Sequence, residues 1–398
     1  MKSILPISPM QEFRKVTVVP SIERRGPIFR GGPIWPRWDT QVFARHCRRN
    51  RPVDSRPDDP ETTPKVYDGS AIWIGPIYWQ FGHQIAEFST RIVQSMDERN
   101  GDKLIFSVMP QFVGKMTWET APAHFRAISE WFGVSREIVE LCHEPITIEH
   151  LRVAKQGEQL GGIGPSSQYL DLLDENWEKK TLSPDITKTT YVSRANLAPY
   201  FGSHAGALYL DDVLRKAGVN VIYPESMTLT AQLLAYKGAE TLIFSEGSAL
   251  HGLQLLGRGL GSVVVLNRRT VESSGPRRMA APQIRPRARH LSYLNVVESL
   301  LQFYNAEEIG LANSAISLFN TERLLDEFNA LGIDLRPHWD EKAYIDMKER
   351  DICSWLSTGW LRHVGERGIS TQQLLLDDLD KAGLGHLRVF VTNTLVRT

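Results

Sequence analysis

Residues 219–266 read VNVIYPESMTLTAQLLAYKGAETLIFSEGSALHGLQLLGRGLGSVVVL, and this stretch decides the fold. Short runs rich in Val and Ile alternate in it with segments of helical length that end at glycines. We expect strands at 219–223, 241–244 and 262–266, with helices at 229–237 and 247–256 closed by Gly238 and Gly257. Buried strands that alternate with helices indicate a parallel sheet with helices on its faces.

The same alternation continues toward the N-terminus. Thr190-Tyr-Val-Ser193 reads as one further strand and 204–217 as the helix after it, which completes a doubly wound unit. Upstream, we expect strands at 71–74 and 104–108 and helices at 82–97 and 118–132. A polar connection at 151–189, with one helix at 169–179, joins the two units.

The two ends of the chain differ from this pattern. Residues 1–64 are rich in Pro, Arg and Gly, which predicts an irregular arm with one or two short strands. Residues 291–398 are predicted to be mainly helical, with helices at 291–304 and 321–331. The domains expected are therefore the arm 1–64, a first α/β domain at 65–185, a second at 186–290 and the helical region 291–398.

Composition excludes some classes of protein. The 398 residues carry 46 Lys and Arg against 46 Asp and Glu, and this neutral balance argues against a nucleic-acid partner. Three widely spaced cysteines fit a reducing compartment and no zinc site. No run reaches the ~18 apolar residues of a membrane span and no secretory signal is visible, so we expect a cytoplasmic protein with at most peripheral contact at the inner face of the membrane. The sequence is silent on oligomeric state.

Arginines gather in two stretches, at 45–51 and at 277–289. Each is either a solvated loop or a site for a phosphate or an acidic acceptor. The second stretch is also a candidate for a mobile loop over a cleft.

The carboxyl ends of parallel strands are where ligands bind in open sheets. Here the second domain would place the candidates Ser193, Arg194, Glu246, Gly247, Ser248 and His251. Gly247 would let a backbone approach a ligand closely, and Ser248 would cap the helix that follows. The free N–H groups at the start of that helix, together with Arg194, would suit a diphosphate. The alternatives are a capped turn with no ligand and, for His251, a place in the core.

His83, Glu87 and Arg91 follow an i, i+4, i+8 spacing. On a helix they form one stripe about 80° wide, separate from the apolar stripe. The plain interpretation is an exposed Glu87–Arg91 ion pair. The functional one is a general base, Glu87 or His83, that takes a proton from a hydroxyl.

Other motifs are missing. The chain has no phosphate-binding GxxxxGK[ST], no HExxH and no GxSxG elbow, and no acidic metal motif lies at an expected strand end. The pair Asp211-Asp212 falls within an expected helix and is interpreted as a solvated face. We therefore expect no metal and no cofactor.

Three of these segments resemble glycosyltransferase family 61, the DUF563 group, whose bacterial members are associated with capsule and exopolysaccharide synthesis. Phe81-Gly-His-Gln-Ile-Ala-Glu87 is similar to its His-x-x-x-Asp/Glu helix start, Tyr191-Val-Ser-Arg194 to its strand ending in Ser-Arg, and 244–250 to its His-Gly-Ala-x-Leu turn. Gln232 falls where the family tends to carry glutamine. The resemblance covers 66–269. Glu246 departs from it by replacing the family's histidine, and the arginine pair that often follows the Ser-Arg strand is missing.

The resemblance implies a GT-B fold, in which two Rossmann-like domains face a cleft and a terminal helix often crosses back to the first domain. It also implies inverting hexosyl or pentosyl transfer from a nucleotide sugar to a saccharide or lipid-linked saccharide, without a metal. Glu87 would be the base, helped by His83, and Arg194 with Gly247 and Ser248 would bind the donor phosphates. The alternative is a non-catalytic carbohydrate-binding or assembly protein on the same scaffold, which Glu246 favours because a carboxylate repels a diphosphate.

Overall fold

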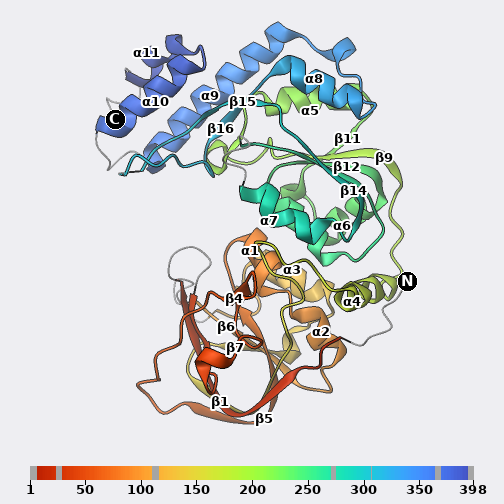
Figure 1. Cartoon of the computed structure of the whole chain (residues 1–398), viewed down its shortest axis with the longest axis vertical. Helices are drawn as coiled ribbons and strands as arrows, with labels where there is room; N and C mark the ends of the chain where they lie inside the picture. Colours follow the sequence, from red (N-terminus) through yellow and green to blue (C-terminus); the bar gives the residue numbers. More distant parts are fainter. Residues whose placement is uncertain are drawn as a thin grey trace.

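The chain folds into two α/β halves, one above the other, with a helical region at the far end of the second half (Figure 1). The computed structural model describes residues 7–23, 29–109, 116–269, 275–305, 307–363 and 369–392. The expected α/β class is confirmed. Within the described residues, no helix combines the length and apolarity needed to cross a bilayer.

The first half is built on a six-stranded sheet of order β2-β1-β8-β5-β6-β7. Four of its strands run parallel, whereas β1 is antiparallel to both of its neighbours, so the expected purely parallel sheet is wrong here. The strands are β1 (Gln11–Glu23), β2 (Phe29–Pro33), β5 (Lys65–Pro76), β6 (Lys103–Ser107), β7 (Val139–Cys142) and β8 (Ile146–Val153).

The N-terminal arm is part of this sheet. Val16 and Val18 of β1 are buried, and Val18 pairs with Ile146 of β8. The sheet curls so far that the Ser21 N–H at the end of β1 donates to the Val108 carbonyl, at 3.1 Å, just beyond β6. The prediction of an irregular arm is therefore wrong for these residues. After β2 the arm forms a short hairpin, β3 (Cys47–Arg48) and β4 (Arg51–Pro52).

The helix expected at 82–97 is broken into three pieces. They are α1 (Phe81–His83), the π-helical turn η2 (Gln84–Phe88) and α2 (Ile92–Asp97). The Thr90 hydroxyl donates to the Glu87 carbonyl at 3.3 Å, so a side chain competes with the backbone where the helix stops. The other helices of this half, α3 (Ala123–Trp131) and α4 (Ser167–Glu178), overlap the predicted ones.

The second half is built on a parallel sheet of order β11-β9-β12-β13-β14. When these strands are numbered by their order along the chain, their order across the sheet is 2-1-3-4-5. This is a doubly wound order with its switch point between β9 and β12. The four strands expected here are confirmed, and β14 is a fifth. The strands are β9 (Thr187–Val192), β11 (Asn220–Ile222), β12 (Ala239–Ser245), β13 (Leu260–Leu266) and β14 (Ala288–Leu294).

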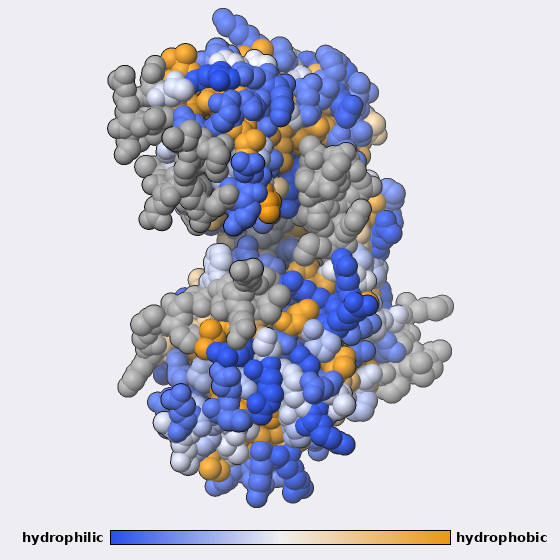
Figure 2. Space-filling view, turned by 60° about the vertical axis from the view of Figure 1, so that its left-hand side comes forward, coloured by the Kyte–Doolittle hydropathy of each residue, from blue (hydrophilic) through white to orange (hydrophobic). Residues whose placement is uncertain are grey.

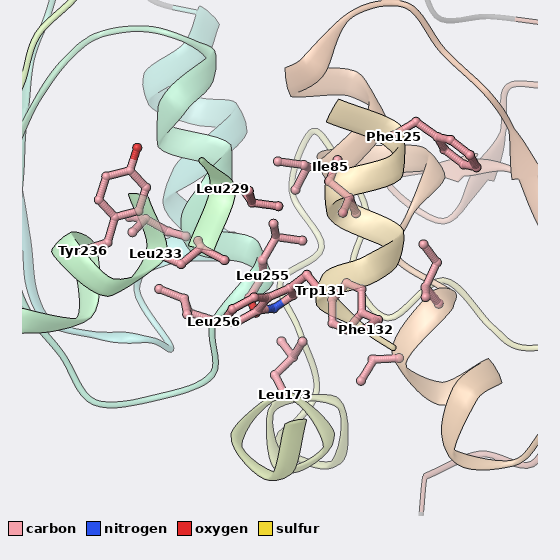
Figure 3. Packing of buried hydrophobic residues seen from close by; sticks show 14 of the residues in the cluster. Ile85, Phe125, Trp131, Phe132, Leu173, Leu229, Leu233, Tyr236, Leu255 and Leu256 are labelled. Atoms are coloured by element: carbon pink, nitrogen blue, oxygen red, sulfur yellow. The ribbon is translucent and has the colours of Figure 1, made fainter. Parts of the chain in front are cut away.

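Helices cover both faces of this sheet. On one face lie α5 (Ala207–Lys216) and α8 (Thr321–Ala330), and on the other α6 (Leu229–Gly238), the 3-10 helix η6 (Ser248–Leu255) and α7 (Gly275–Ile284). The second face also packs on the first half, so one continuous apolar core joins the halves. Trp131 of α3 lies in that junction, and its indole N–H donates to the Leu255 carbonyl at 3.2 Å (Figure 3).

The C-terminal region is not mainly helical at its start. The helix expected at 291–304 is replaced by the end of β14 and by β15 (Val297–Leu301), which with β10 (Ser203–His204) and β16 (Ile316–Phe319) forms a small sheet. The helices α9 (Glu341–His363) and α10 (Ile369–Lys381) pack on this small sheet. They lie at the end of the molecule remote from the first half, so the expected return to the first domain is not seen in the described helices (Figure 1). The short helices are η1 (Trp38–Thr40), η3 (Arg136–Ile138), η4 (Pro199–Phe201), η5 (Pro224–Ser226), η7 (Arg336–His338), η8 (Gly385–Leu387) and α11 (Arg388–Phe390).

Candidate functional site

Glu87 is the centre of a buried hydrogen-bond network in the first half. Its side chain is fully buried, and each carboxylate oxygen accepts two hydrogen bonds. Arg48 donates to both oxygens, at 2.7 and 2.8 Å, while His83 donates to Oε1 at 2.5 Å and His46 to Oε2 at 3.1 Å. A carboxylate offers about four lone-pair positions, and all are occupied here.

The β3–β4 hairpin brings Arg48 and His46 to Glu87. Its turn residues Arg49 and Asn50 have φ of 52° and 59°, the left-handed geometry of a tight hairpin turn. Gln156, just beyond β8, holds the hairpin by accepting from the Cys47 N–H at 2.6 Å. The sequence analysis missed His46 and Gln156. The arginine stretch at 45–51 did indicate an anion site in this segment, and the anion that Arg48 binds is the carboxylate of Glu87.

This network makes Glu87 a poor proton acceptor. Burial would raise the pKa of Glu87, but hydrogen bonds from His46, His83 and Arg48 outweigh it and hold the pKa far below its ordinary value. Such a carboxylate stays ionised and accepts a proton only weakly. The geometry therefore favours Glu87 as the residue that orients a base.

His83 has the geometry of that base. Because ionised Glu87 can only accept, the His83 Nδ1 must donate, and a neutral ring then carries its lone pair on Nε2. Nε2 has no hydrogen-bond partner among the described residues, and the side chain is 23% exposed. A histidine oriented by a carboxylate through one nitrogen, with the other nitrogen open, is the arrangement that activates hydroxyl groups in hydrolases.

Arg91 does not join the stripe that the sequence predicted. It is buried, and its guanidinium donates to the backbone carbonyls of Ala154 and Arg45, each at 2.8 Å, and more weakly to those of Ala44 and Ile74. The prediction of an exposed Glu87–Arg91 ion pair is therefore wrong. From the start of α2, Arg91 instead hydrogen-bonds to carbonyls of β5, of the end of β8 and of the arm.

The His83–Glu87 pair lies against the second half through Gly82. A Cβ built on Gly82 would be 3.0 Å from the Ser248 Cβ and 3.1 Å from the His251 Cδ2, so α1 and η6 are in close contact. Burial lowers the pKa of His251, as does repulsion by the nearby His83, and its Nδ1 bonds to Gln254 at 2.7 Å. The acceptor-side and donor-side residues predicted from the sequence thus come together.

A cleft of about 930 Å³ opens between the halves. The surface is also hollowed between the halves in the view of Figure 2. The cleft lies where α3 of the first half faces the switch point of the second sheet, and its lining includes Phe81, Trp131, Arg194, Met227 and Ser248. Of the other predicted residues, Ser193 lines the cleft, whereas His83, Glu87, Glu246, Gly247 and His251 lie outside its lining.

Gly247 allows the close approach that the sequence predicted, and the group that approaches is Arg194. A Cβ on Gly247 would be 2.1 Å from the Arg194 Nη1, although the φ of 179° suits any residue. The helix after it differs from the prediction. η6 is a 3-10 helix that begins at Ser248, so Gly247 holds the capping position and the expected cap by the Ser248 side chain is wrong.

Glu246 turns away from the cleft. Its carboxylate accepts from the Arg268 N–H and the Arg269 Nε, both at 2.8 Å, and again from the Arg269 Nη2. The carboxylate that departs from the family pattern is thus bound by the protein's own arginine.

Two further interpretations from the sequence need correction. Asp211 is fully buried under the end of β9, where its Oδ2 accepts from the Ser193 hydroxyl at 2.7 Å, whereas Asp212 is exposed as predicted. The stretch 277–289 is mostly helix α7 and not a loop, and Arg287 is buried. The side chains of Arg277 and Arg278 lie outside the described residues.

Comparison with known proteins adds no family. No protein-family model matches the chain, and no curated protein sequence matches it either. The resemblance to glycosyltransferase family 61 therefore stays a prediction based on the three motifs.

Proposed function

We propose that the chain is an inverting, metal-independent glycosyltransferase with a GT-B-like arrangement of its two halves. It would move a hexosyl or pentosyl group from a nucleotide sugar to a saccharide or lipid-linked saccharide in polysaccharide biosynthesis, in the cytoplasm or at the inner face of the membrane. One observation carries the proposal. The His83–Glu87 pair of the first half packs through Gly82 onto the carboxyl edge of the doubly wound sheet, next to a cleft that contains Arg194.

Each residue has a role in a single displacement. The acceptor oxygen bonds to the anomeric carbon of the donor, and its proton passes to the His83 Nε2. Glu87 holds the His83 ring and stabilises the imidazolium that forms, as the carboxylate of a triad does. The bond from the anomeric carbon to the donor phosphate breaks, and the electron pair leaves on a phosphate oxygen near Arg194.

The binding-protein alternative loses its supporting observation. It rested on Glu246 repelling a diphosphate, and Glu246 is paired with Arg269. We keep this alternative only as an outcome of the test below.

Calorimetry with UDP, GDP, CDP and CMP in EDTA tests the binding part of the proposal. Turnover is then measured as hydrolysis of the matching nucleotide sugars, in which water takes the place of the acceptor hydroxyl and gives its proton to His83. We expect one nucleotide to bind, and Arg194→Ala to abolish this binding. His83→Gln should bind normally but lose turnover by a factor of about 10²–10⁴, the usual value of a general base. Glu87→Gln should bind the nucleotide normally and also lose turnover.

Two results would contradict the assignment. Full turnover in His83→Gln, with none in Glu87→Gln, would make Glu87 the base. Absence of binding by any nucleotide at millimolar concentration would favour the carbohydrate-binding alternative.

A further inference from the structure

Gln156 lies just beyond β8 and connects the β3–β4 hairpin with Glu87, and it is 5% exposed. Its Oε1 accepts from the Cys47 N–H at 2.6 Å. Its Nε2 lies 3.3 Å from the His46 Nδ1 and donates to the Glu87 carbonyl at 3.5 Å. A backbone N–H can only donate, so the amide atom that faces Cys47 must be the oxygen. The NH2 group of Gln156 therefore faces His46.

This orientation determines which nitrogen of His46 carries a proton. An amide NH2 group can only donate, so the Nδ1 that it faces must offer a lone pair. The proton of a neutral ring then lies on Nε2, which donates to the Glu87 Oε2 at 3.1 Å. A positively charged His46 would turn a second N–H toward the amide, and two donors would face each other at 3.3 Å. These contacts therefore hold His46 neutral.

The surroundings of the His46 ring also disfavour a positive charge. The ring packs against Phe88 and Phe29, with centroids 4.9 and 5.6 Å away. Cys47 adds no charge, because burial raises the pKa of its thiol. The charged groups near His46 and Cys47 come from the arm, η2, the start of α2 and the segment after β8, and they are Arg45, Arg48, Asp54, Glu87, Arg91 and Lys155. The cations outnumber the anions here, so a further cation would be unfavourable.

A neutral His46 leaves Arg48 as the single cation that donates to Glu87 while His83 is neutral. When His83 takes a proton, it becomes the second cation on this carboxylate, and a charged His46 would make a third. His83 otherwise faces the phenol of Tyr78, with ring centroids 5.7 Å apart, and His251, whose pKa burial lowers. Neither group is an anion, so Glu87 is the group that can stabilise a positive charge on His83.

We propose that Gln156 is a positioning residue, whose amide fixes His46 as the neutral tautomer with its proton on Nε2, so that the charge of Glu87 is available to the imidazolium that forms on His83. The catalytic part of this inference rests on the proposed function, whereas the tautomer of His46 does not. Gln156 lies outside the lining of the cleft, so it acts on proton transfer and not on nucleotide binding.

NMR of the protein with 15N-labelled histidines measures the tautomer directly. The His46 and His83 signals are assigned by their loss in His46→Gln and His83→Gln. At about pH 6.5, where an unperturbed histidine is half protonated, wild-type His46 should have a proton on Nε2 and none on Nδ1. Gln156→Glu keeps the acceptor for the Cys47 N–H and replaces the NH2 group by an acceptor oxygen, so both nitrogens of His46 should then carry protons.

Hydrolysis of the nucleotide sugar measures the catalytic part. In Gln156→Glu a charged His46 competes with His83 for Glu87, so kcat should fall roughly tenfold, a part of the 10²–10⁴-fold that a general base contributes. The acid limb of the pH profile should move to lower pH, because His83 holds its proton less tightly, while nucleotide affinity stays unchanged.

The matched control is Gln159→Glu. Gln159 holds the same hairpin through the Asn50 N–H and Oδ1, at 2.7 and 3.1 Å, and its side chain bonds to no histidine among the described residues. This variant should keep the neutral His46 and the pH profile of wild type.

A doubly protonated His46 in wild type would overturn the proposal, even if Gln156→Glu does not fold. The same His46 signals in Gln156→Glu as in wild type would also overturn it. Equal losses of kcat in Gln156→Glu and Gln159→Glu, with neither pH profile moved, would make Gln156 structural. If wild type shows the expected tautomer but hydrolyses no nucleotide sugar, the proposed function fails and the assignment of His46 stands.

Discussion

At the scale of single residues, Asp211 shows how burial sets the charge beside the cleft. Its Oδ2 accepts from the hydroxyls of Ser193 and Tyr223, at 2.7 and 2.8 Å, and its Oδ1 has no partner in the described structure. Burial raises the pKa of Asp211 to about 6, more than those two hydrogen bonds lower it. The folded protein therefore holds this proton more tightly than the unfolded chain.

This sets the sign of a pH dependence. Between the unfolded pKa of 3.8 and about 6, the folded state keeps a proton that the unfolded state releases, so the contribution of Asp211 to stability falls as pH rises and levels off above 6. In Asp211→Asn this fall is absent. The melting temperature of the variant minus that of wild type should therefore increase from pH 4 to 6 and then stay constant. The exposed neighbour in Asp212→Asn is the control, and the same slope in both variants would contradict the prediction.

At the scale of elements, Arg91 fixes the broken helix that carries His83 and Glu87. Its guanidinium reaches carbonyls on β5, at the end of β8 and in the arm just before His46. A lysine places its donors at one point and cannot serve three segments. Arg91→Lys should lower the free energy of unfolding by roughly 2–4 kcal/mol, the order expected for charged hydrogen bonds left unmade.

Urea unfolding measures this loss. The control is Arg99→Lys, two residues beyond the end of α2, because among the described residues the Arg99 side chain donates to the Asp102 carbonyl alone. Equal losses in the two variants would mean that the contacts of Arg91 add nothing. Because the arm also carries His46 and Arg48, Arg91→Lys should in addition reduce turnover.

Elements with local signals were predictable from the sequence, and elements that depend on distant partners were not. The strands β12 and β13 contain apolar runs bounded by polar residues or glycine, and β9 is rich in β-branched and aromatic residues, which favour strands. All three are confirmed. The segment 291–304 has leucines at helical spacing, but Leu291 and Leu294 pair with Val263 and Leu266 of β13, and this pairing outweighs local preference. β1 was missed because its partner β8 lies far along the chain and because Pro and Gly surround it.

The site divides in the same way. His83 and Glu87 are four residues apart, and the predicted helical stripe brings them together despite the π-helical turn. His46 and Arg48 come from a hairpin about forty positions earlier, and no periodicity connects them to Glu87. The spacing in the sequence therefore identified the His83–Glu87 pair. The hydrogen bonds from His46 and Arg48 to Glu87 could be identified only from the fold.

At the scale of the whole molecule, a fully buried ion pair fastens the two halves. Arg287, just before β14, donates to both oxygens of Glu158, which follows β8, at 2.8 and 3.0 Å. Burial raises the pKa of Glu158 against the pull of Arg287. Arg287 also donates to the Leu256 carbonyl at 2.8 Å, so the pair is part of the junction around Trp131.

Removing one partner should leave a buried charge uncompensated. We expect Arg287→Met to lower the free energy of unfolding by about 3–5 kcal/mol, and the double variant Arg287→Met/Glu158→Leu to recover most of that loss. Arg258→Met is the control, because Arg258 joins α4 through Asp171 and Asp174 but is 30% exposed, and such pairs contribute less. Chemical denaturation provides the values, and a double variant no more stable than Arg287→Met would contradict the argument.

The shared core also has a consequence for how the chain is made. Ile85, Trp131, Leu233 and Leu256 belong to one apolar cluster. During synthesis, Ile85 and Trp131 emerge from the ribosome well before Leu233 and Leu256, which complete the cluster. At ordinary rates of translation, on the order of ten seconds separate Glu158 from Arg287. During that interval the nascent first half exposes the apolar surface that the second half later covers, and Glu158 has no counter-ion. We therefore expect the nascent chain to need a holding chaperone, and the first half to precipitate when it is expressed alone.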